Sequence, residues 1–318
     1  MKSISKNHQL SAYGGSQWAP RTAGMQQELG HIWETCGMVD EWRRLKAVLL
    51  HRPGLELEAS VDPDKVQMLE PLDVNKAAHQ HDMLAEAYRA AGVRVHYVDP
   101  PVTPNPNQMF VADLMFMTPQ GAVVCRPAST IRAGEERWIA RCLADIGIPI
   151  LRTISGNGTF EGADALWIDD RTVLIGRGLR TNDAGIQQLS DLLNAMGIDP
   201  VVVDMPFGTM HLMGMLRILD KDLAVAWPDR LALAAVLLLQ QKGYRVEFIP
   251  DETEAQQGFA LNVVTLGPRQ ILLADGNPIT QQFYENLGVI CTTVEVGELA
   301  KAAGSIGCLT GILHRAED

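Results

Sequence analysis

A repeat with a spacing of 45 to 55 residues constrains the fold of this chain more than any other feature of its sequence. Five segments share one pattern, a helix-forming stretch that ends near a glycine and is followed by an apolar strand: AYRAAGVRVHYVD, CLADIGIPILRTI, LLNAMGIDPVVVD, LLQQKGYRVEFIP and FYENLGVICTTVE. Their glycines are Gly92, Gly147, Gly197, Gly243 and Gly288. Glycine at this place ends a helix without steric cost, because it adopts the left-handed conformation freely. The repeat therefore predicts a modular α/β fold.

Two short strands are expected upstream of each helix, so the repeating unit is strand–strand–helix–strand. In units two to five, apolar runs flank compact turns typical of β-hairpins, at residues 119–121, 169–170, 221–222 and 268–269. One such unit cannot bury its own apolar face, so the copies must pack against one another. We expect them to close into a five-bladed α/β propeller. The competing linear solenoid needs closer repeat similarity and capping units.

The chain is expected to divide into an N-terminal arm or leader, residues 1–40, and a single propeller domain, residues 41–318. The first segment is polar and lies outside the repeat. No apolar run reaches the ~18 residues that span a membrane, and the longest, residues 231–239, reads as a buried helix. The N-terminus also lacks the apolar core of a secretory signal.

Charge and cysteine content narrow the function. The formal net charge of -11 argues against a nucleic-acid partner and suits a small cationic substrate, although acidity can also serve solubility alone. The five cysteines form no CxxC pair and no zinc spacing, a pattern typical of reduced thiols in the cytoplasm. The sequence leaves the oligomeric state open, with a homo-oligomer allowed.

Polar residues interrupt the repeat at four joins between units, which would face a shared centre in a closed ring. Asp113 lies in the apolar segment FVADLMFM, which we expect to be a strand, and Glu161 and Asp164 lie in FEGAD. His211 lies in MHLM, and Cys308 lies in GCLTGILHR, expected to be a short strand that closes the ring. Small residues around the paired acids favour a close backbone turn, and paired acids can hold a planar cation or orient a base.

Each of these residues has an ordinary explanation when taken alone. The carboxylates fit capped rim or loop acids, His211 fits a hydrogen-bonded core histidine, and Cys308 fits an inert buried thiol. Together they make up a thiolate nucleophile, a proton-transferring base and an orienting carboxylate, which converge in space rather than in sequence. The chain has no HxxH, no HExxH and no aspartate-rich ligand cluster, so no metal and no other cofactor are expected.

The segments MFVAD, FEGAD, MHL and GCLTGILHR resemble signature segments of the guanidino-group-modifying enzymes, across roughly residues 44–315. That superfamily includes dimethylarginine dimethylaminohydrolases, arginine deiminases and amidinotransferases. Each segment is short, but the four occur in the right order. The resemblance implies a five-bladed α/β propeller, also called a pentein, which agrees with the count of repeats.

The resemblance also implies roles for matching residues. Cys308 would be the nucleophile, His211 the general acid and base, and Glu161 the carboxylate that orients His211 and touches the substrate. Asp113 would bind the guanidinium nitrogens, and Asp164 would support the site.

Three further positions bear on substrate binding. Arg132 and Arg180 fit the family's carboxylate-binding positions, where a guanidinium fork suits an amino-acid carboxylate, although a surface ion pair would explain either. Met213 stands where deiminases and amidinotransferases place an aspartate, and Ala112 stands where many relatives have arginine. An uncharged thioether at position 213 would tolerate an apolar N-substituent on the substrate.

The sequence thus predicts a hydrolase of arginine or an N-substituted arginine, closest to the dimethylarginine dimethylaminohydrolases. It would work through a covalent cysteine adduct and release citrulline with an amine or ammonia. One alternative is an amidinotransferase, which passes the amidino group to an amine. A second is a non-catalytic protein that binds guanidino compounds.

Overall fold

A computed structural model describes residues 10–59 and 62–316 of the chain. The repeat is confirmed: five small sheets of three strands each are arranged in a ring. In every sheet, the middle strand pairs antiparallel with one neighbour and parallel with the other. Units two to five follow the predicted order of hairpin, helix and parallel strand. The fold is a five-bladed α/β propeller.

The elements of units two to five are contiguous in the sequence. Unit two contains β3 Met115–Thr118, β4 Gly121–Val124, α4 Glu136–Asp145 and β5 Ile150–Thr153. Unit three contains β6 Ala165–Asp169, β7 Thr172–Arg177, α5 Asp183–Ala195 and β8 Asp199–Asp204. Unit four contains β9 Leu216–Asp220, β10 Leu223–Ala226, α6 Leu233–Gln241 and β11 Arg245–Phe248. Unit five contains β12 Val264–Gly267, β13 Gln270–Ala274, α8 Pro278–Asn286 and β14 Ile290–Val294.

Unit one is assembled from both ends of the chain and closes the ring. Its elements are β1 Leu45–Leu50, α2 Val74–Ala90, β2 Arg94–Tyr97 and the C-terminal strand β15 Gly311–Arg315. The middle strand β1 pairs antiparallel with β15 and parallel with β2. Contacts between β1 and β12 join unit one to unit five. The last strand therefore completes the first blade, as the sequence predicts.

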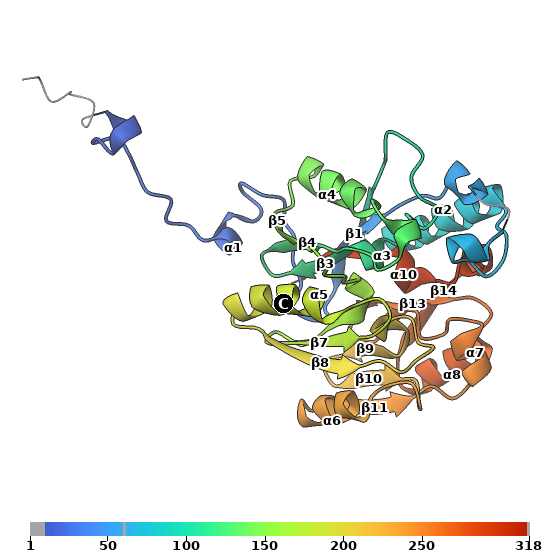
Figure 1. Cartoon of the computed structure of the whole chain (residues 1–318). Helices are drawn as coiled ribbons and strands as arrows, with labels where there is room; N and C mark the ends of the chain where they lie inside the picture. Colours follow the sequence, from blue (N-terminus) through green and yellow to red (C-terminus); the bar gives the residue numbers. More distant parts are fainter. Residues whose placement is uncertain (1–9, 60–61, 317–318) are drawn as a thin grey trace, which may run out of the picture.

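The five glycines that end the long helices all have positive φ angles, from 74° to 89°. This confirms the helix-terminating role predicted for them, because the left-handed conformation is rarely adopted by other residues. The five long helices lie around the periphery of the molecule, whereas the short helices α3 Val111–Leu114 and α10 Ile306–Leu309 lie toward its centre (Figure 1). The remaining short helices are α1 Met25–Glu28, α7 Glu252–Gln256 and α9 Gly297–Ala300.

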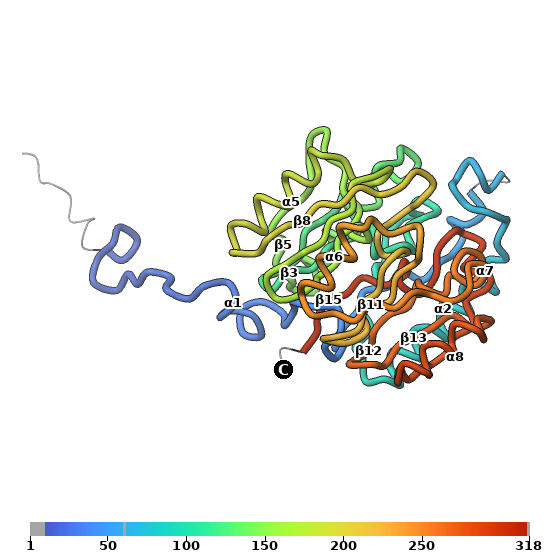
Figure 2. The backbone as a smooth tube through the Cα atoms, turned by 90° about the horizontal axis from the view of Figure 1, so that it is seen from below, coloured from blue at the N-terminus to red at the C-terminus, as the bar shows by residue number. Residues whose placement is uncertain are grey.

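The segment before the ring is only partly separate from it. The described residues that precede α1 run away from the body of the molecule in both views (Figures 1 and 2). Closer to the ring, Cys36 and Met38 are buried, and the backbone of Gly37 bonds to Leu313 and Arg315 of β15. The expected boundary at residue 40 therefore falls within packed chain, and the division into arm and domain stays a prediction. None of the helices in the described part of the chain has the length and apolar character needed to cross a membrane.

Candidate active site

The polar joins lie on short turns of helix that directly precede the first strand of a blade. Asp113 lies in α3, before β3, and Cys308 lies in α10, before β15. The predicted strand around Asp113 and the predicted strand position of Cys308 are therefore wrong. Glu161 and His211 are the N-cap residues of two single 3₁₀ turns, η6 Gly162–Asp164 and η7 Leu212–Gly214. Contacts of α3 with α10 and η6, and of η6 with η7, bring the joins together at the centre.

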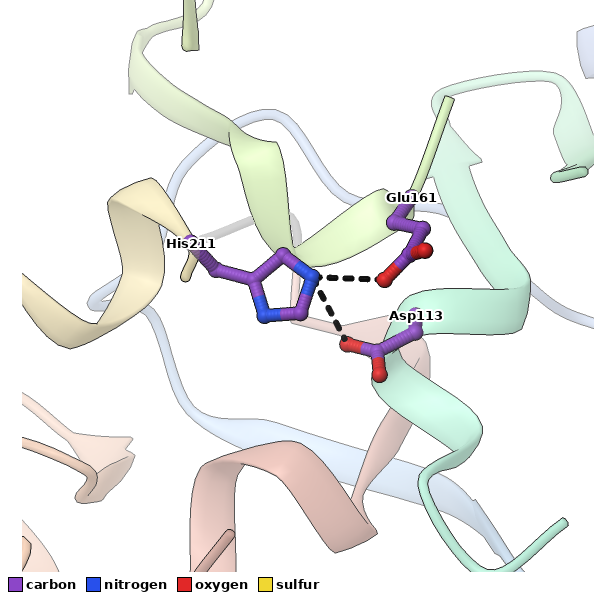
Figure 3. A group of neighbouring side chains, drawn as sticks. All are labelled: Asp113, Glu161 and His211. Atoms are coloured by element: carbon purple, nitrogen blue, oxygen red, sulfur yellow. Dashed lines mark hydrogen bonds and ion pairs between the residues drawn. The ribbon is translucent and has the colours of Figure 1, made fainter. Parts of the chain in front are cut away.

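His211 faces two carboxylates that come from different blades, and both of them approach the same ring nitrogen (Figure 3). Its Nε2 atom lies 2.7 Å from Oε2 of Glu161 and 3.8 Å from Oδ1 of Asp113. All three side chains are buried, and no described residue is hydrogen-bonded to Oδ1 of Asp113. A buried acceptor without a donor is costly, so Oδ1 is ready to accept a hydrogen bond from a ligand.

The segment around Glu161 is held rigidly. A Cβ atom on Gly162 would lie 2.1 Å from the carbonyl oxygen of Met115, so only glycine fits where these two backbone segments approach each other.

Asp164 lines neither of the two central cavities described below. Instead it accepts hydrogen bonds from the Leu212 amide at 3.0 Å and the Thr181 hydroxyl at 2.7 Å. Asp164 thus fixes the turn that carries His211, which suits a positioning residue better than a substrate ligand.

The charges of His211 and Glu161 support each other. Burial alone would lower the pKa of His211, but Asp113, Glu161 and Asp164 together raise that pKa to about 9. Burial alone would raise the pKa of Glu161, but the bond to His211 and the nearby arginines lower it to about 2. Near neutral pH, the pair is therefore an imidazolium and a carboxylate, so His211 carries a proton that it can donate.

The two candidate arginines differ in how many of their guanidinium nitrogens are already paired with protein groups. Arg132 is buried, with Nη1 lying 2.6 Å from Asp113 and 3.6 Å from Glu161, and with Nε lying 2.9 Å from Glu135. A substrate carboxylate would have to displace one of these partners. Arg180 lies 3.6 Å from Glu161, and its Nε atom has no hydrogen-bond partner among the described residues. Arg180 is therefore the better placed of the two to bind an anion.

Cys308 is held by a residue that the sequence analysis missed. Asn262 lies just before β12, at the fifth join of the ring. Its Oδ1 atom accepts a hydrogen bond from the Cys308 amide at 3.0 Å, and its Nδ2 atom donates to the Cys308 sulfur at 2.9 Å. The only signal was an asparagine in the mostly apolar segment FALNVVTL, at the position equivalent to the other joins.

The environment of Cys308 disfavours its thiolate until positive charge arrives. Burial and the Asp113 carboxylate raise the pKa of the Cys308 thiol, whereas the Ser305 backbone, Asn262 and Arg217 lower it. A cation bound against Asp113 would cancel that carboxylate's effect. Binding of a guanidinium would thereby favour the nucleophilic form of the cysteine.

Replacing Asn262 by alanine is expected to lower kcat about 10- to 100-fold with little change in KM. The variant loses a hydrogen bond to the sulfur and one to the backbone of α10, so the thiolate is both less stabilised and less well placed. Steady-state kinetics on the best substrate would measure the effect. A change confined to KM would contradict this role, because it would assign Asn262 to substrate binding.

Two cavities meet at Cys308 and His211. The smaller one has a volume of about 20 Å³ and is lined by polar side chains that include Asp113, Arg132 and Arg180. The larger one, called here the apolar chamber, has a volume of about 350 Å³. Its apolar side chains include Met210, Met213, Met215, Trp227, Phe259 and Leu261. Cys308 and His211 line both cavities, so the reacting groups stand at the boundary between them.

The carboxylates around His211 also have to be considered as metal ligands. One ligand atom each from Asp113, Glu161 and His211 lie within 4.8 Å of one another. The guanidinium of Arg132 is already paired with both acids at this place. Its positive charge would repel a divalent cation, so the group fits the orientation of an imidazolium better than metal binding.

Comparison with known proteins gives a consistent assignment. Residues 64–314 match the family model described as N,N dimethylarginine dimethylhydrolase, eukaryotic. An N(G),N(G)-dimethylarginine dimethylaminohydrolase from Streptomyces coelicolor is 30% identical over 86% of this chain and 99% of its own. The corresponding protein from Pseudomonas aeruginosa is 26% identical over 75% of this chain and 89% of its own.

Solved structures support the fold. A mutant of the Pseudomonas aeruginosa dimethylarginine dimethylaminohydrolase, complexed with citrulline, superposes with a TM-score of 0.71 at 23% identity, covering 86% of this chain and 100% of its own. An amidinotransferase from Microseira wollei superposes with a TM-score of 0.73 at 15% identity, covering 89% of this chain and 98% of its own.

Proposed function

The chain belongs to the dimethylarginine dimethylaminohydrolase family, and we propose that it hydrolyses an N-substituted arginine through a covalent adduct on Cys308. Family membership makes it a C–N hydrolase that acts on guanidino groups. The observation that carries the proposal is the buried His211–Glu161 pair at 2.7 Å, with Asp113 3.8 Å from the same His211 nitrogen and with Cys308 and His211 lining the same two cavities.

In the first half of the proposed reaction, the Cys308 thiolate attacks the guanidinium carbon while Asp113 binds the guanidinium nitrogens. A carbon–sulfur bond forms, and the bond from carbon to the substituted nitrogen breaks. The His211 imidazolium donates its proton to the departing amine, which leaves a thiouronium adduct on Cys308. The raised pKa of His211, about 9, ensures that this proton is present.

In the second half, neutral His211 takes a proton from water, and the resulting hydroxide attacks the adduct carbon. The tetrahedral adduct loses its hydroxyl proton to solvent as the carbonyl forms, the carbon–sulfur bond breaks, and the sulfur leaves as the thiolate. The products are a ureido compound, citrulline for an arginine substrate, and one amine. Glu161 keeps the imidazole oriented through both proton transfers.

The proposal is tested by a product screen in ¹⁸O-labelled water, with and without an amine acceptor. Arginine, methylarginines and agmatine are incubated with the protein, and the products are identified by mass spectrometry. We expect citrulline that carries one ¹⁸O atom, together with the released amine. A new guanidino compound formed on the acceptor would indicate an amidinotransferase. Binding without turnover, and without labelling of Cys308 by a haloamidine, would indicate a non-catalytic binding protein.

Two further features belong to this proposal. The five cysteines are all free, which supports a reducing setting such as the cytoplasm. The substrate partner is a small guanidino cation, and the proposed chemistry takes place within one subunit whether or not the protein forms a homo-oligomer.

A further inference from the structure

The chemistry of the apolar chamber differs from that of the small cavity on the other side of Cys308. Among the described residues that line it, none is an aspartate or a glutamate. The one charged side chain besides His211 is Arg230, whose guanidinium lies 5.0 Å from the Trp227 ring centroid and 3.9 Å from Glu252. The α-ammonium of an amino acid would therefore find no carboxylate in the chamber, whereas an apolar group would find thioether and aromatic surface.

The volume of the chamber indicates how large an apolar group it can hold. About 10–15 Å³ of such space already admits one water molecule, so 350 Å³ has room for a group of many heavy atoms. A dimethylamino group has only three heavy atoms. Two methyl groups would leave most of the apolar surface unburied, and burial of that surface is favourable in proportion to its area.

The position of the chamber decides which part of a substrate can reach it. Cys308 and His211 line it directly, so a nitrogen that takes its proton from His211 lies at its mouth. Asp113 and Arg180 line the small cavity and not the chamber, so the groups proposed to bind the guanidinium nitrogens and the carboxylate do not contact what the chamber holds. The substituent on the departing nitrogen is therefore the part of the substrate that enters the chamber.

We infer that the preferred substrate is a guanidino compound whose departing nitrogen carries an apolar substituent larger than two methyl groups, held in the apolar chamber. The inference depends on the proposed guanidino hydrolase function and deepens it. It assigns Met210, Met213, Trp227 and Phe259 to the binding of this substituent.

Gly214 is the position at which the chamber can be filled, and it is also the last residue of the turn η7 that carries His211, so the test compares substrates with one another within each variant. It lines the chamber, a Cβ atom on it would have no neighbour within 4 Å, and its φ angle is one that other residues adopt. Gly297, at the start of α9, is a matched control, because a Cβ atom there also meets nothing within 4 Å and the residue is exposed away from both cavities.

The experiment compares Gly214→Leu and Gly297→Leu with the unchanged protein on arginines that carry methyl, dimethyl, propyl or benzyl substituents on the terminal nitrogen. Released amine and citrulline are both measured. We expect kcat/KM of the unchanged protein to rise about tenfold or more from dimethyl to benzyl. Gly214→Leu should remove that rise, so that the ratio of kcat/KM for the benzyl over the dimethyl substrate falls to about one or below, and Gly297→Leu should keep the ratio of the unchanged protein. Gly214→Ala should give an intermediate result, which keeps the test valid if the leucine variant folds poorly.

Two outcomes would overturn the inference while the proposed function stands. The first is a preference of the unchanged protein for dimethylarginine over larger substituents. The second is a ratio of kcat/KM for benzyl over dimethyl that stays the same in Gly214→Leu, because filling the chamber would then not act on the substituent. If the protein releases amine from none of these substrates, the proposed function itself is overturned, and the inference falls with it.

Discussion

Replacing Cys308 by serine is expected to lower kcat/KM by at least about 10³-fold, because no other described group in the two cavities can form the thiouronium adduct. A serine hydroxyl is much less nucleophilic at neutral pH, and nothing in the site is placed to deprotonate it before attack. His211 is held as an imidazolium by its surrounding carboxylates, so it cannot serve as the initial base. Steady-state release of citrulline measures the loss.

Cys291 provides the matched control for that substitution. It is a free, partly exposed cysteine in β14, and it lines neither central cavity. Cys291→Ser should keep full activity and should still be labelled once by a haloamidine on Cys308. Turnover by Cys308→Ser at the rate of the unchanged protein would rule out the covalent mechanism.

The parts of the fold that could be predicted from the sequence depend on local signals. A residue that ends a helix in the left-handed conformation is usually glycine, and this requirement depends only on the backbone of that residue. The five glycines therefore revealed the repeat and the number of blades. The hairpin turns are local in the same sense. Closure of the ring was predicted because the repeats show neither the close similarity nor the capping units of a solenoid, and the C-terminal segment was expected to be an extra strand that closes the ring. In the structure, β15 does pair with β1.

The errors arose where local signals are ambiguous. The segments around Asp113 and Cys308 are buried one-turn helices of four residues each, too short to show a helical period. An apolar run of this length reads equally well as a strand. The meeting of Asp113, Glu161, His211 and Cys308 at the centre could still be predicted, because their positions at the joins depend on the repeat and not on the type of element that carries them.

The features that could not be predicted depend on contacts between blades. Arg132 has three acidic partners from two different blades. Because these ion pairs occupy Arg132, Arg180 is the arginine that is more available to bind an anion. Asn262 contacts Cys308 across 46 residues of sequence. The apolar chamber is built from residues of unit four, from the segments on either side of it, and from Leu69, Ala303 and Cys308, and only the folded ring brings them together.

Replacing Glu161 by glutamine is expected to lower kcat about 10²-fold at neutral pH and to move the high-pH limb of the kcat profile to lower pH. With saturating substrate, the first step needs the His211 imidazolium, so kcat is full below the pKa of His211 and falls as pH rises through it. Glu161 is one of the groups that raise this pKa to about 9. A hydrogen bond to a charged group contributes about 1.5–3 kcal/mol, so its loss should lower the limb by about 1 to 2 pH units.

The pH profile separates this role from a general loss of structure. Glu285→Gln, an exposed acid on α8 far from the site, should keep both the rate and the limb unchanged. A Glu161→Gln variant that loses rate but keeps its limb near pH 9 would show that the carboxylate does not control the proton on His211. In that case Asp113, which also raises the pKa of His211 and lies 3.8 Å from its Nε2 atom, would be the residue that holds the imidazolium.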